Sequence, residues 1–317
     1  MKKIDVSILV LTYNHDKYLR QALESIFMQK TTYKYEVLII NNGSNDGTGT
    51  IIEEFYLKNP GIVRVITKKE KISPTKCSLE AMQQCKGRYL ASCEGDDFWL
   101  DENKIQRQID FLEENKEYVG CTHPVLLVNE LGDIASRKRL YWVSNCKRYR
   151  LKDYDGLRLP GHISSFIRRN LFLNSDFDAS LIPEASLFIG DRTNFLLWLE
   201  QGDIYRLKNK MSAYRVRTKE ESLTQSLYAT NKEHSRSEFD LINKIDEYIS
   251  LKNIKISLTK RYLAIYADCI YDLFKYGEDA DKTLPSEIRK KIGSVLCNLS
   301  LPFFLLGKFV KRFMYYY

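Results

Sequence analysis

The sequence contains no run of 18 apolar residues and no pair of cysteines with C-x-x-C spacing. A transmembrane helix needs about 20 apolar residues in succession, so none is expected. The apolar run 6–11 is too short for a signal peptide. The seven cysteines fall mostly in expected helices and strands, where a thiol behaves as a small buried apolar group. We therefore expect reduced thiols, no structural zinc site and a cytoplasmic protein, at most placed at the inner face of the cytoplasmic membrane.

Proline and glycine are also scarce, with 7 and 15 residues in 317, which excludes collagen-like and low-complexity chains. Hydrophobic residues make up 44% and charged residues 28%, as in ordinary globular proteins. The net charge is +8, and between 287 and 317 six Lys and Arg residues face a single Glu. A nucleic-acid binder would spread basic residues over a known motif, and none is found, so no nucleic-acid partner is expected.

Residues 1–100 alternate between apolar strand patterns and helical patterns. Strands are predicted at 6–11, 36–40, 63–66 and 89–93, with amphipathic helices between them. Such β-α units favour a parallel sheet covered by helices on both faces. Ligands bind beyond the carboxyl ends of the strands in these sheets. We therefore expect the polar loops 12–16, 41–48 and 94–97 to form one cleft.

The remaining sequence predicts a second half of mixed α and β structure and then a helical region. One strand is predicted over 119–129, a β-like segment over 162–168 and a helix over 193–200, with short strands at 204–207 and 211–216. From about 230 the pattern is helical. The predicted organisation is a domain over 1–220, made of halves 1–100 and 101–220, followed by a helical region over 221–317.

Three carboxylates lie within four residues at Glu94-Gly95-Asp96-Asp97, directly after a predicted strand. Neighbouring carboxylates repel one another unless a cation or strong hydrogen-bond donors are present. Mg²⁺ and Mn²⁺ prefer such oxygen ligands and often share them with a phosphate. A solvated acidic turn is an equally good interpretation of the spacing alone.

Three further motifs are ambiguous when taken singly. The loop 41–48 can read a base or ribose through Asn42 and Asp46, or can be an ordinary polar turn. Thr12-Tyr13-Asn14 can hold a flat base, or can begin the following helix through an Asn cap. Asp191, after Gly190, can be a general base toward a sugar hydroxyl, or a helix cap.

In this order along the chain, residues 6–14, 40–48 and 94–99 together resemble the family 2 inverting glycosyltransferases. The resemblance covers about residues 4–218 and is closest to members that build capsule, O-antigen and other bacterial surface polysaccharides. It implies the GT-A fold, a mixed α/β sheet flanked by helices, here with a helical C-terminal appendage. It also implies transfer of a sugar from a nucleoside-diphosphate sugar to a hydroxyl of a glycan or a lipid-linked acceptor.

The resemblance implies a role for each matching residue. The nucleotide-sugar pocket would be formed by Thr12, Tyr13, Asn14, Asn42, Asp46, Glu94 and Asp96. A Mn²⁺ or Mg²⁺ ion would be held by Asp96 with Asp97 in support, and Asp191 would be the catalytic base. The acceptor side would be formed by His162, Ser164, Tyr214 and Arg215, with Trp99 either stacking on a sugar or packing in the core.

Two residues depart from the family pattern. Asn42 stands where the family usually has an Asp that reads the base. An amide oxygen still accepts from a pyrimidine N–H, so nucleotide binding would survive while the identity of the nucleotide stays open. The donor expected from the resemblance is a UDP-sugar. Arg217 stands where many members have His. An Arg can contact phosphate directly instead of binding a metal, so the set of metal ligands and the dependence on metal stay open.

The C-terminal segment 295–317 has two interpretations. Its apolar residues, flanking Lys and Arg and three terminal Tyr fit a peripheral contact with an anionic membrane surface. The alternative is packing on the core or on a second subunit, as a homodimer. For the whole chain, the alternative to an enzyme is a catalytically inactive sugar-nucleotide-binding or membrane scaffold protein.

Overall fold

The computed structural model describes residues 3–135, 140–187, 189–217, 231–277, 280–294, 296–302 and 304–305. The chain divides into two compact units, one formed by 1–151 with 159–216 and the other by 152–158 with 217–317. The predicted boundary at residue 220 falls outside the described residues and stays a prediction. All residues expected in the site belong to the first unit.

The amino-terminal part of the first unit is a parallel sheet. Its strands are β1 (Val6–Thr12), β2 (Tyr35–Asn41), β3 (Val63–Thr67) and β4 (Tyr89–Ser92), hydrogen-bonded in the order β3-β2-β1-β4. The register pairs Thr12 with Asn41, so the ends of β1 and β2 lie level with each other. The loops that follow these two strands therefore leave the sheet at the same edge.

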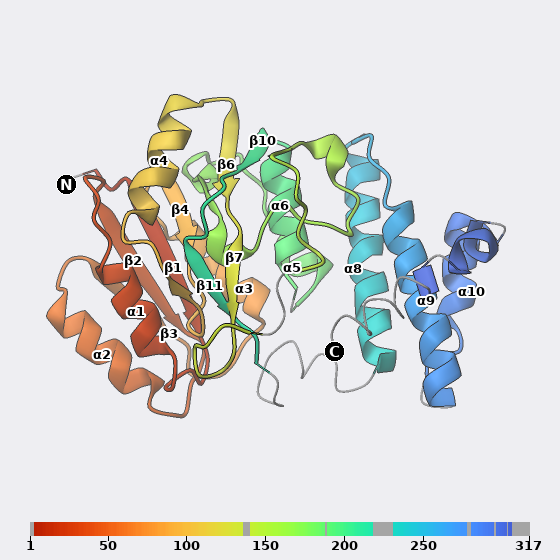
Figure 1. Ribbon diagram of the computed structural model, residues 1–317, viewed down its shortest axis with the longest axis horizontal. Coiled ribbons are helices and arrows are strands. Elements are labelled where there is room, and N and C mark those ends of the chain that lie inside the picture. The colour runs from red at the N-terminus through yellow and green to blue at the C-terminus, as the bar shows by residue number, and fades with distance from the viewer. Residues whose placement is uncertain are drawn as a thin grey trace. The chain divides into compact units, whose positions relative to one another are not determined.

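Helices cover both faces of this sheet (Figure 1). They are α1 (Leu19–Phe27), α2 (Thr48–Lys58), α3 (Pro74–Gln83), α4 (Lys104–Glu114), α5 (Leu181–Ala185) and α6 (Asp191–Leu199). The main core packs alternate residues of β1, namely Val6, Ile8 and Val10, against apolar stripes of α1, α2 and α4. This alternation follows from the two-residue period of a strand.

The sheet continues beyond β4 with strands of both directions. They are β9 (Ile167–Arg169), β6 (Tyr118–Thr122), β10 (Asp203–Arg206) and β8 (Arg148–Tyr149), in the order β4-β9-β6-β10-β8. Strand β9 is antiparallel to both of its neighbours. A smaller sheet has the order β5-β11-β7, with β5 (Phe98–Trp99), β11 (Ser212–Arg215) and β7 (Val125–Val128). The predicted mixed sheet flanked by helices is confirmed.

Two predicted strands differ in the structure. The expected strand 119–129 is two strands, β6 and β7, which belong to different sheets and are separated by His123-Pro124. Pro124 has no N–H to donate to a ladder, which favours a break at this point. In the segment 162–168, residues Ile163–Ser165 form a 3₁₀ turn, because the His162 ring nitrogen Nδ1 accepts from Ser164 N at 3.2 Å.

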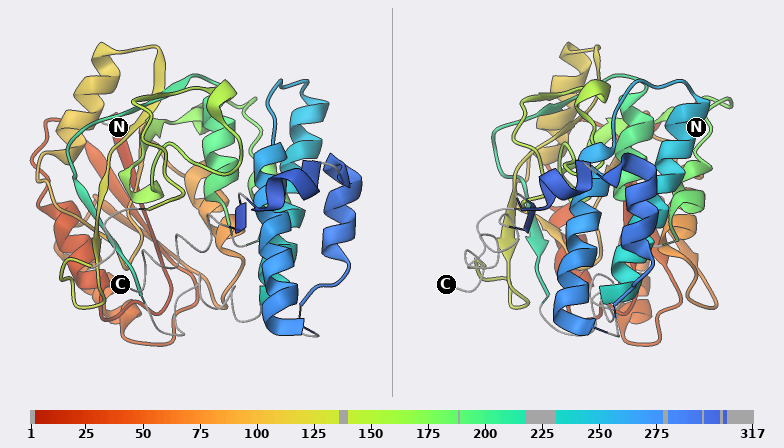
Figure 2. Two further views of the ribbon diagram at one scale, coloured as in Figure 1. Left: turned by 45° about the vertical axis from the view of Figure 1, so that its right-hand side comes forward. Right: turned by 90° about the vertical axis from the view of Figure 1, so that its right-hand side faces the viewer.

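The second unit is helical in its described part, as predicted. It contains α8 (Asn231–Leu251), α9 (Thr259–Tyr276) and α10 (Leu284–Ile292), and α9 packs against both of the others (Figure 2). A buried ion pair between Glu238 and Arg261 joins α8 to α9. No helix in the described residues is long and apolar enough to cross a membrane. The predicted membrane contact depends on the segment 295–317, of which residues 295, 303 and 306–317 lie outside the described part, and it stays a prediction.

The seven cysteines all lie within the described residues and occur as free thiols. Six of them are buried, and Cys146 is exposed. The buried positions agree with the apolar role expected for these side chains.

Substitution of Gly87 tests how closely the chain packs beside β1. A Cβ at Gly87 would lie 2.4 Å from Ser7 N and 2.5 Å from Val6 C, both backbone atoms that cannot move aside. We expect Gly87→Ala to lower the free energy of unfolding by ~1–3 kcal/mol, measured in urea. Gly49→Ala is the control, because it meets no atom within 4 Å in helix α2 and should raise stability by up to ~1 kcal/mol. Equal effects of the two substitutions would contradict the packing argument.

Candidate active site

Two polar loops meet at the carboxyl edge of the parallel sheet. Asn14, in a left-handed conformation with φ of 51°, accepts at its Oδ1 from Asn45 N at 3.0 Å. Its own N–H donates to Ser44 Oγ at 3.0 Å, and His15 N donates to Thr48 Oγ1 at 2.9 Å. The structure therefore brings loops 12–16 and 41–48 together, as the sequence predicted.

Asp46 holds these two loops in place. Its carboxylate accepts from Thr48 N at 3.0 Å and from Asp16 N at 3.1 Å. Burial acts to raise the pKa of Asp46, but the hydrogen bonds from Thr48 and Asp16 outweigh it and the net pKa shift is downward. The Asp46 carboxylate is therefore stabilised as an anion.

The acidic loop 94–97 lies directly on the first loop. A Cβ at Gly95 would be 2.6 Å from Thr12 Oγ1 and 2.7 Å from His15 Nδ1, so only glycine fits here. His15 Nε2 lies 3.8 Å from Asp96 Oδ2. Thr12 Oγ1 is buried and has no hydrogen-bond partner among the described residues. All three loops predicted to form one cleft are thus in contact.

The Asp97 carboxylate is buried at the base of this loop, with 1% of the residue exposed. Its Oδ1 accepts from Arg215 N at 3.0 Å, and its Oδ2 accepts from the Ser164 hydroxyl. Burial raises the pKa of Asp97 to about 8, and the negative charge of Asp96 adds to the shift. The site therefore concentrates negative charge more strongly than its donors compensate.

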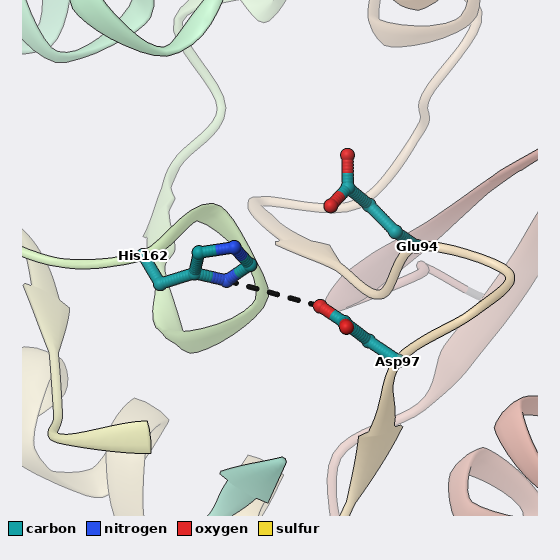
Figure 3. A group of neighbouring side chains, drawn as sticks. All are labelled: Glu94, Asp97 and His162. Atoms are coloured by element: carbon teal, nitrogen blue, oxygen red, sulfur yellow. Dashed lines mark ion pairs between the residues drawn. The ribbon is translucent and has the colours of Figure 1, made fainter. Parts of the chain in front are cut away.

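Glu94, Asp97 and His162 point toward one another (Figure 3). One ligand atom from each lies within 4.8 Å of the others, and His162 Nδ1 is 3.8 Å from Asp97 Oδ2. Burial lowers the pKa of His162 to about 4, so its ring is neutral at pH 7 and can coordinate a cation. Carboxylate and imidazole donors beside excess negative charge fit a divalent metal.

Tyr214 packs beside the acidic loop. Its ring lies 4.3 Å from the His162 ring, measured between centroids, and His162 Nδ1 is 3.8 Å from Asp97 Oδ2. Burial raises the pKa of the Tyr214 hydroxyl, and the charges of Asp97, Glu94, Asp96 and Asp191 raise it further.

Asp191 is the first residue of helix α6, which is buried from Thr193 to Leu199. Burial raises the pKa of its carboxyl group, while the positive charges of Arg192 and Arg168 oppose the shift. A carboxyl with a raised pKa is the stronger base once it is ionised. The N-cap of α6 is Gly190, and no side chain caps the helix, so the cap interpretation of Asp191 is wrong. Its role as a base stays a prediction.

Tyr13 and Asn42, predicted to bind the base, both contact the segment that precedes α3. The Lys71 ammonium lies 4.0 Å from the centroid of the Tyr13 ring. Asn42 Nδ2 donates to Ile72 O at 2.9 Å, and Asn42 Oδ1 accepts from Ile72 N at 3.0 Å. Their roles in reading a nucleotide stay predictions.

Trp99 was expected either at the acceptor side or in the core. It is 1% exposed, belongs to the main core, and has the Lys104 ammonium 4.5 Å from its ring centroid. This position corrects the stacking interpretation, because a ring without exposed area offers no face to a sugar.

The Arg215 guanidinium binds backbone. It donates to Asp96 O at 2.9 Å and to Glu130 O at 2.8 Å, and it also reaches Gln21 Oε1 at 2.6 Å. Arg215 therefore fixes the acidic loop from behind. Its expected contact with an acceptor stays a prediction.

Sequence reasoning missed three residues beside the site. Arg168 is 1% exposed and lies between the rings of Phe166 and Trp198. Ser73 and Thr75, at the start of α3, bind the chain just before Asp191. The Ser-Pro pair at 73–74 is a helix-start signal, but it gives no sign of a partner more than 100 residues away.

The family model described as Glycosyl transferase family 2 matches residues 7–173, more than half of the chain. The chain belongs to glycosyl transferase family 2. The prediction from the motifs is thereby confirmed.

Sequence relatives and solved structures agree with this family. An uncharacterized protein of Mycobacterium tuberculosis strain H37Rv is 35% identical over 127 residues, which is 40% of this chain and 37% of that protein. The E. coli chondroitin synthase is 25% identical over 80% of this chain and 34% of its own length. The crystal structure of S. aureus TarS 1-349 with UDP-GlcNAc aligns with a TM-score of 0.60 and 15% identity, over 99% of this chain and 93% of that one. The GT-A fold predicted for the chain is confirmed.

Two adjacent serines test the Asp97 environment. Ser164 donates to the Asp97 carboxylate, whereas Ser165 donates to the His162 carbonyl at 2.6 Å, and both are fully buried. We expect Ser164→Ala to cost ~2–3 kcal/mol of unfolding free energy at pH 9, where Asp97 is ionised, and Ser165→Ala about 1 kcal/mol.

The pH dependence separates these two variants further. Ser164 favours the ionised form, so its contribution is largest above the Asp97 pKa of about 8 and declines as the pH falls through it. Urea unfolding at pH 6 and pH 9 in metal-free buffer measures this difference. A Ser164→Ala penalty independent of pH would contradict the assignment.

Proposed function

We propose that the protein is an inverting glycosyltransferase that moves a sugar from a nucleoside-diphosphate sugar to a hydroxyl of a glycan or lipid-linked acceptor. The observation that carries the proposal is the meeting of loops 12–16, 41–48 and 94–97 at the carboxyl edge of the sheet, where Glu94, Asp97 and His162 lie within reach of one cation. This arrangement supplies the cation-binding side of a reaction centre, and Asp191 is the residue that we assign as its base. The process that we infer is bacterial surface-polysaccharide synthesis.

Family relatives support this choice of substrate class. A relative named putative teichuronic acid biosynthesis glycosyltransferase TuaG of Bacillus subtilis is 28% identical over 34% of this chain and 42% of its own length. The TarS structures with UDP and UDP-GlcNAc cover 95% and 99% of this chain. On this basis a UDP-sugar is the donor that we propose to test first.

Mn²⁺ or Mg²⁺ would be held by Asp96 with Asp97 in support, and Glu94 and His162 offer further donor atoms within 4.8 Å of one on Asp97. Bound there, the ion would neutralise charge on the diphosphate. Asp97 is already engaged by Ser164 and Arg215 N, so we assign it the task of orienting the loop.

The reaction that we infer is one in-line displacement. Asp191 accepts the proton of the acceptor hydroxyl, whose oxygen forms a bond to the anomeric carbon. The bond from that carbon to the diphosphate oxygen breaks, and the nucleoside diphosphate leaves with the electron pair. Attack from the face opposite to the leaving group inverts the configuration.

Nucleotide binding is tested by thermal shift with UDP, with and without Mn²⁺. We expect UDP with Mn²⁺ to stabilise the protein by ~3 kcal/mol at 100 times its dissociation constant. In Asp96→Asn the part that depends on Mn²⁺ should disappear, because one anionic ligand is removed. Equal Mn²⁺-dependent shifts in both proteins would contradict the role of Asp96, and GDP and ADP serve as controls for the base.

Catalysis is tested with Asp191→Asn in an assay of UDP-sugar turnover. We expect a fall in kcat of at least ~100-fold, since a missing general base costs ~10²–10⁴-fold, while the UDP thermal shift stays unchanged. Asp191 accepts a proton only in its deprotonated form, and its pKa is raised above the ordinary value of 3.8. The wild-type rate should therefore fall as the pH is lowered, with a midpoint above pH 3.8. Near-normal turnover by Asp191→Asn would refute the proposed function.

A further inference from the structure

Residues 70–75 form a segment that touches the donor side of the site and the chain before Asp191. We refer to it as the bridging segment. We propose that Ser73 and Thr75 in this segment are positioning residues, which fix Asp191 relative to the bound donor and transmit donor binding to it. This inference rests on the proposed function of Asp191 as the base.

The donor end of the bridging segment is fixed by backbone contacts. Gly43, with φ of 78°, approaches it so closely that a Cβ there would lie 2.6 Å from Glu70 C and from Lys71 N. Asn42 closes two hydrogen bonds on Ile72, at its N–H and at its carbonyl. Residues 70–72 are therefore packed tightly against loop 41–48. A ligand that shifts this loop would shift residues 70–72 with it.

The side chain of Lys71 extends this contact to the first loop. Its ammonium lies 4.0 Å from the Tyr13 ring centroid, a cation–π distance. A base that stacks on Tyr13 from that side would displace Lys71, and a diphosphate would attract it. Donor binding thus acts on the bridging segment through Lys71 as well as through Asn42.

The other end of the bridging segment holds the chain before Asp191. Ser73 Oγ donates to Leu187 O at 2.6 Å, and Thr75 Oγ1 donates to Ser186 O at 2.7 Å. The two hydroxyl oxygens are themselves 2.9 Å apart. Each hydroxyl has one proton to donate. When both protons are donated to the carbonyls of Ser186 and Leu187, neither is left for the contact between the two hydroxyls.

The carbonyls lie a few residues before Asp191, and short contacts connect them to it. Ile189 N donates to Ser186 Oγ at 3.0 Å, and Asn194 N donates to Gly190 O at 2.9 Å. A Cβ at Gly190 would lie 3.3 Å from the Thr75 methyl carbon Cγ2. Thr75 therefore touches the residue before Asp191 with its methyl group and holds the preceding turn with its hydroxyl.

The position of Asp191 along the chain makes these bonds relevant to rate. Helix α6 is anchored in the core from Thr193 onward, but Gly190 provides no side-chain cap for its start. The hydroxyls of Ser73 and Thr75 are the side-chain contacts from α3 that fix the approach to this start. A base displaced by about 1 Å from its working position can cost ~100-fold in rate.

The test compares two substitutions at Thr75. Thr75→Val keeps the shape and the methyl contact but removes the hydroxyl, and Thr75→Ser keeps the hydroxyl. We expect Thr75→Val to lower kcat for UDP-sugar turnover by ~10–100-fold with KM for the donor within ~2-fold, and Thr75→Ser to retain most of the wild-type kcat. Ser7→Ala is the control, a buried hydroxyl bonded to Glu36 at the amino end of β1.

If Thr75 had only a structural role, Thr75→Val would lower stability, and the acid limb of the pH profile of kcat would stay unchanged. If Thr75 positions Asp191, the acid limb of kcat should move in Thr75→Val, whereas Ser7→Ala should lose stability without any change in profile. A Thr75→Val enzyme with the wild-type kcat and the wild-type pH profile would overturn the inference. The proposed function is judged separately, because Asp191→Asn is assayed in the same experiment.

Hydrogen exchange in the unmutated chain provides a readout that depends on neither turnover nor a variant. UDP with Mn²⁺ should slow amide exchange in residues 12–16 and 41–48, and also in residues 189–194. Protection of the first two loops without protection of 189–194 overturns the transmission, whereas no protection by any nucleoside diphosphate overturns the proposed function and the inference with it.

Discussion

The buried carboxylate of Asp97 is the interaction on which the rest of the site depends. One of its oxygens binds the backbone of β11, and the other binds the hydroxyl of Ser164 in the 3₁₀ turn. Segments from three parts of the chain are thereby joined at one carboxyl group. Burying this group in its ionised form is costly, which raises its pKa to about 8. Asp97 thus links the acidic loop to β11 and to the turn at 163–165.

Electrostatics around the site are asymmetric. Glu94, Asp96 and Asp97 lie in one loop, while the buried Arg168 has its guanidinium over the rings of Phe166 and Trp198 and affects the Asp191 carboxyl through charge. Burial lowers the pKa of Arg168 to about 10, which still leaves it charged at pH 7. Negative side chains are thus concentrated in the acidic loop, and the positive charge of Arg168 acts on Asp191.

Sequence patterns predicted the part of the fold in which local signals suffice. The β-α units of the first hundred residues have clear periodicities, and their strands and loops lie where expected. The break at His123-Pro124 and the turn after His162 were missed, since a change of sheet and a ring that accepts a backbone N–H depend on distant neighbours. The same limit applies to the site. The acidic motif is visible in the sequence as a local cluster, whereas the partners of Ser73 and Thr75 lie more than 100 residues away and leave no local pattern. Trp99 shows the converse, because an aromatic beside a motif looks functional until its burial is known.

The single exposed cysteine has a practical consequence. Cys146 is open to solvent, while the other six thiols are buried, and burial raises the pKa of each of the six. Thiolates are the species that react with maleimides and iodoacetamides. A fluorophore or spin label would therefore attach at Cys146 alone in the unaltered chain, in the segment between β7 and β8. A second cysteine introduced on the surface would then complete a label pair for distance measurements, without prior removal of the native cysteines.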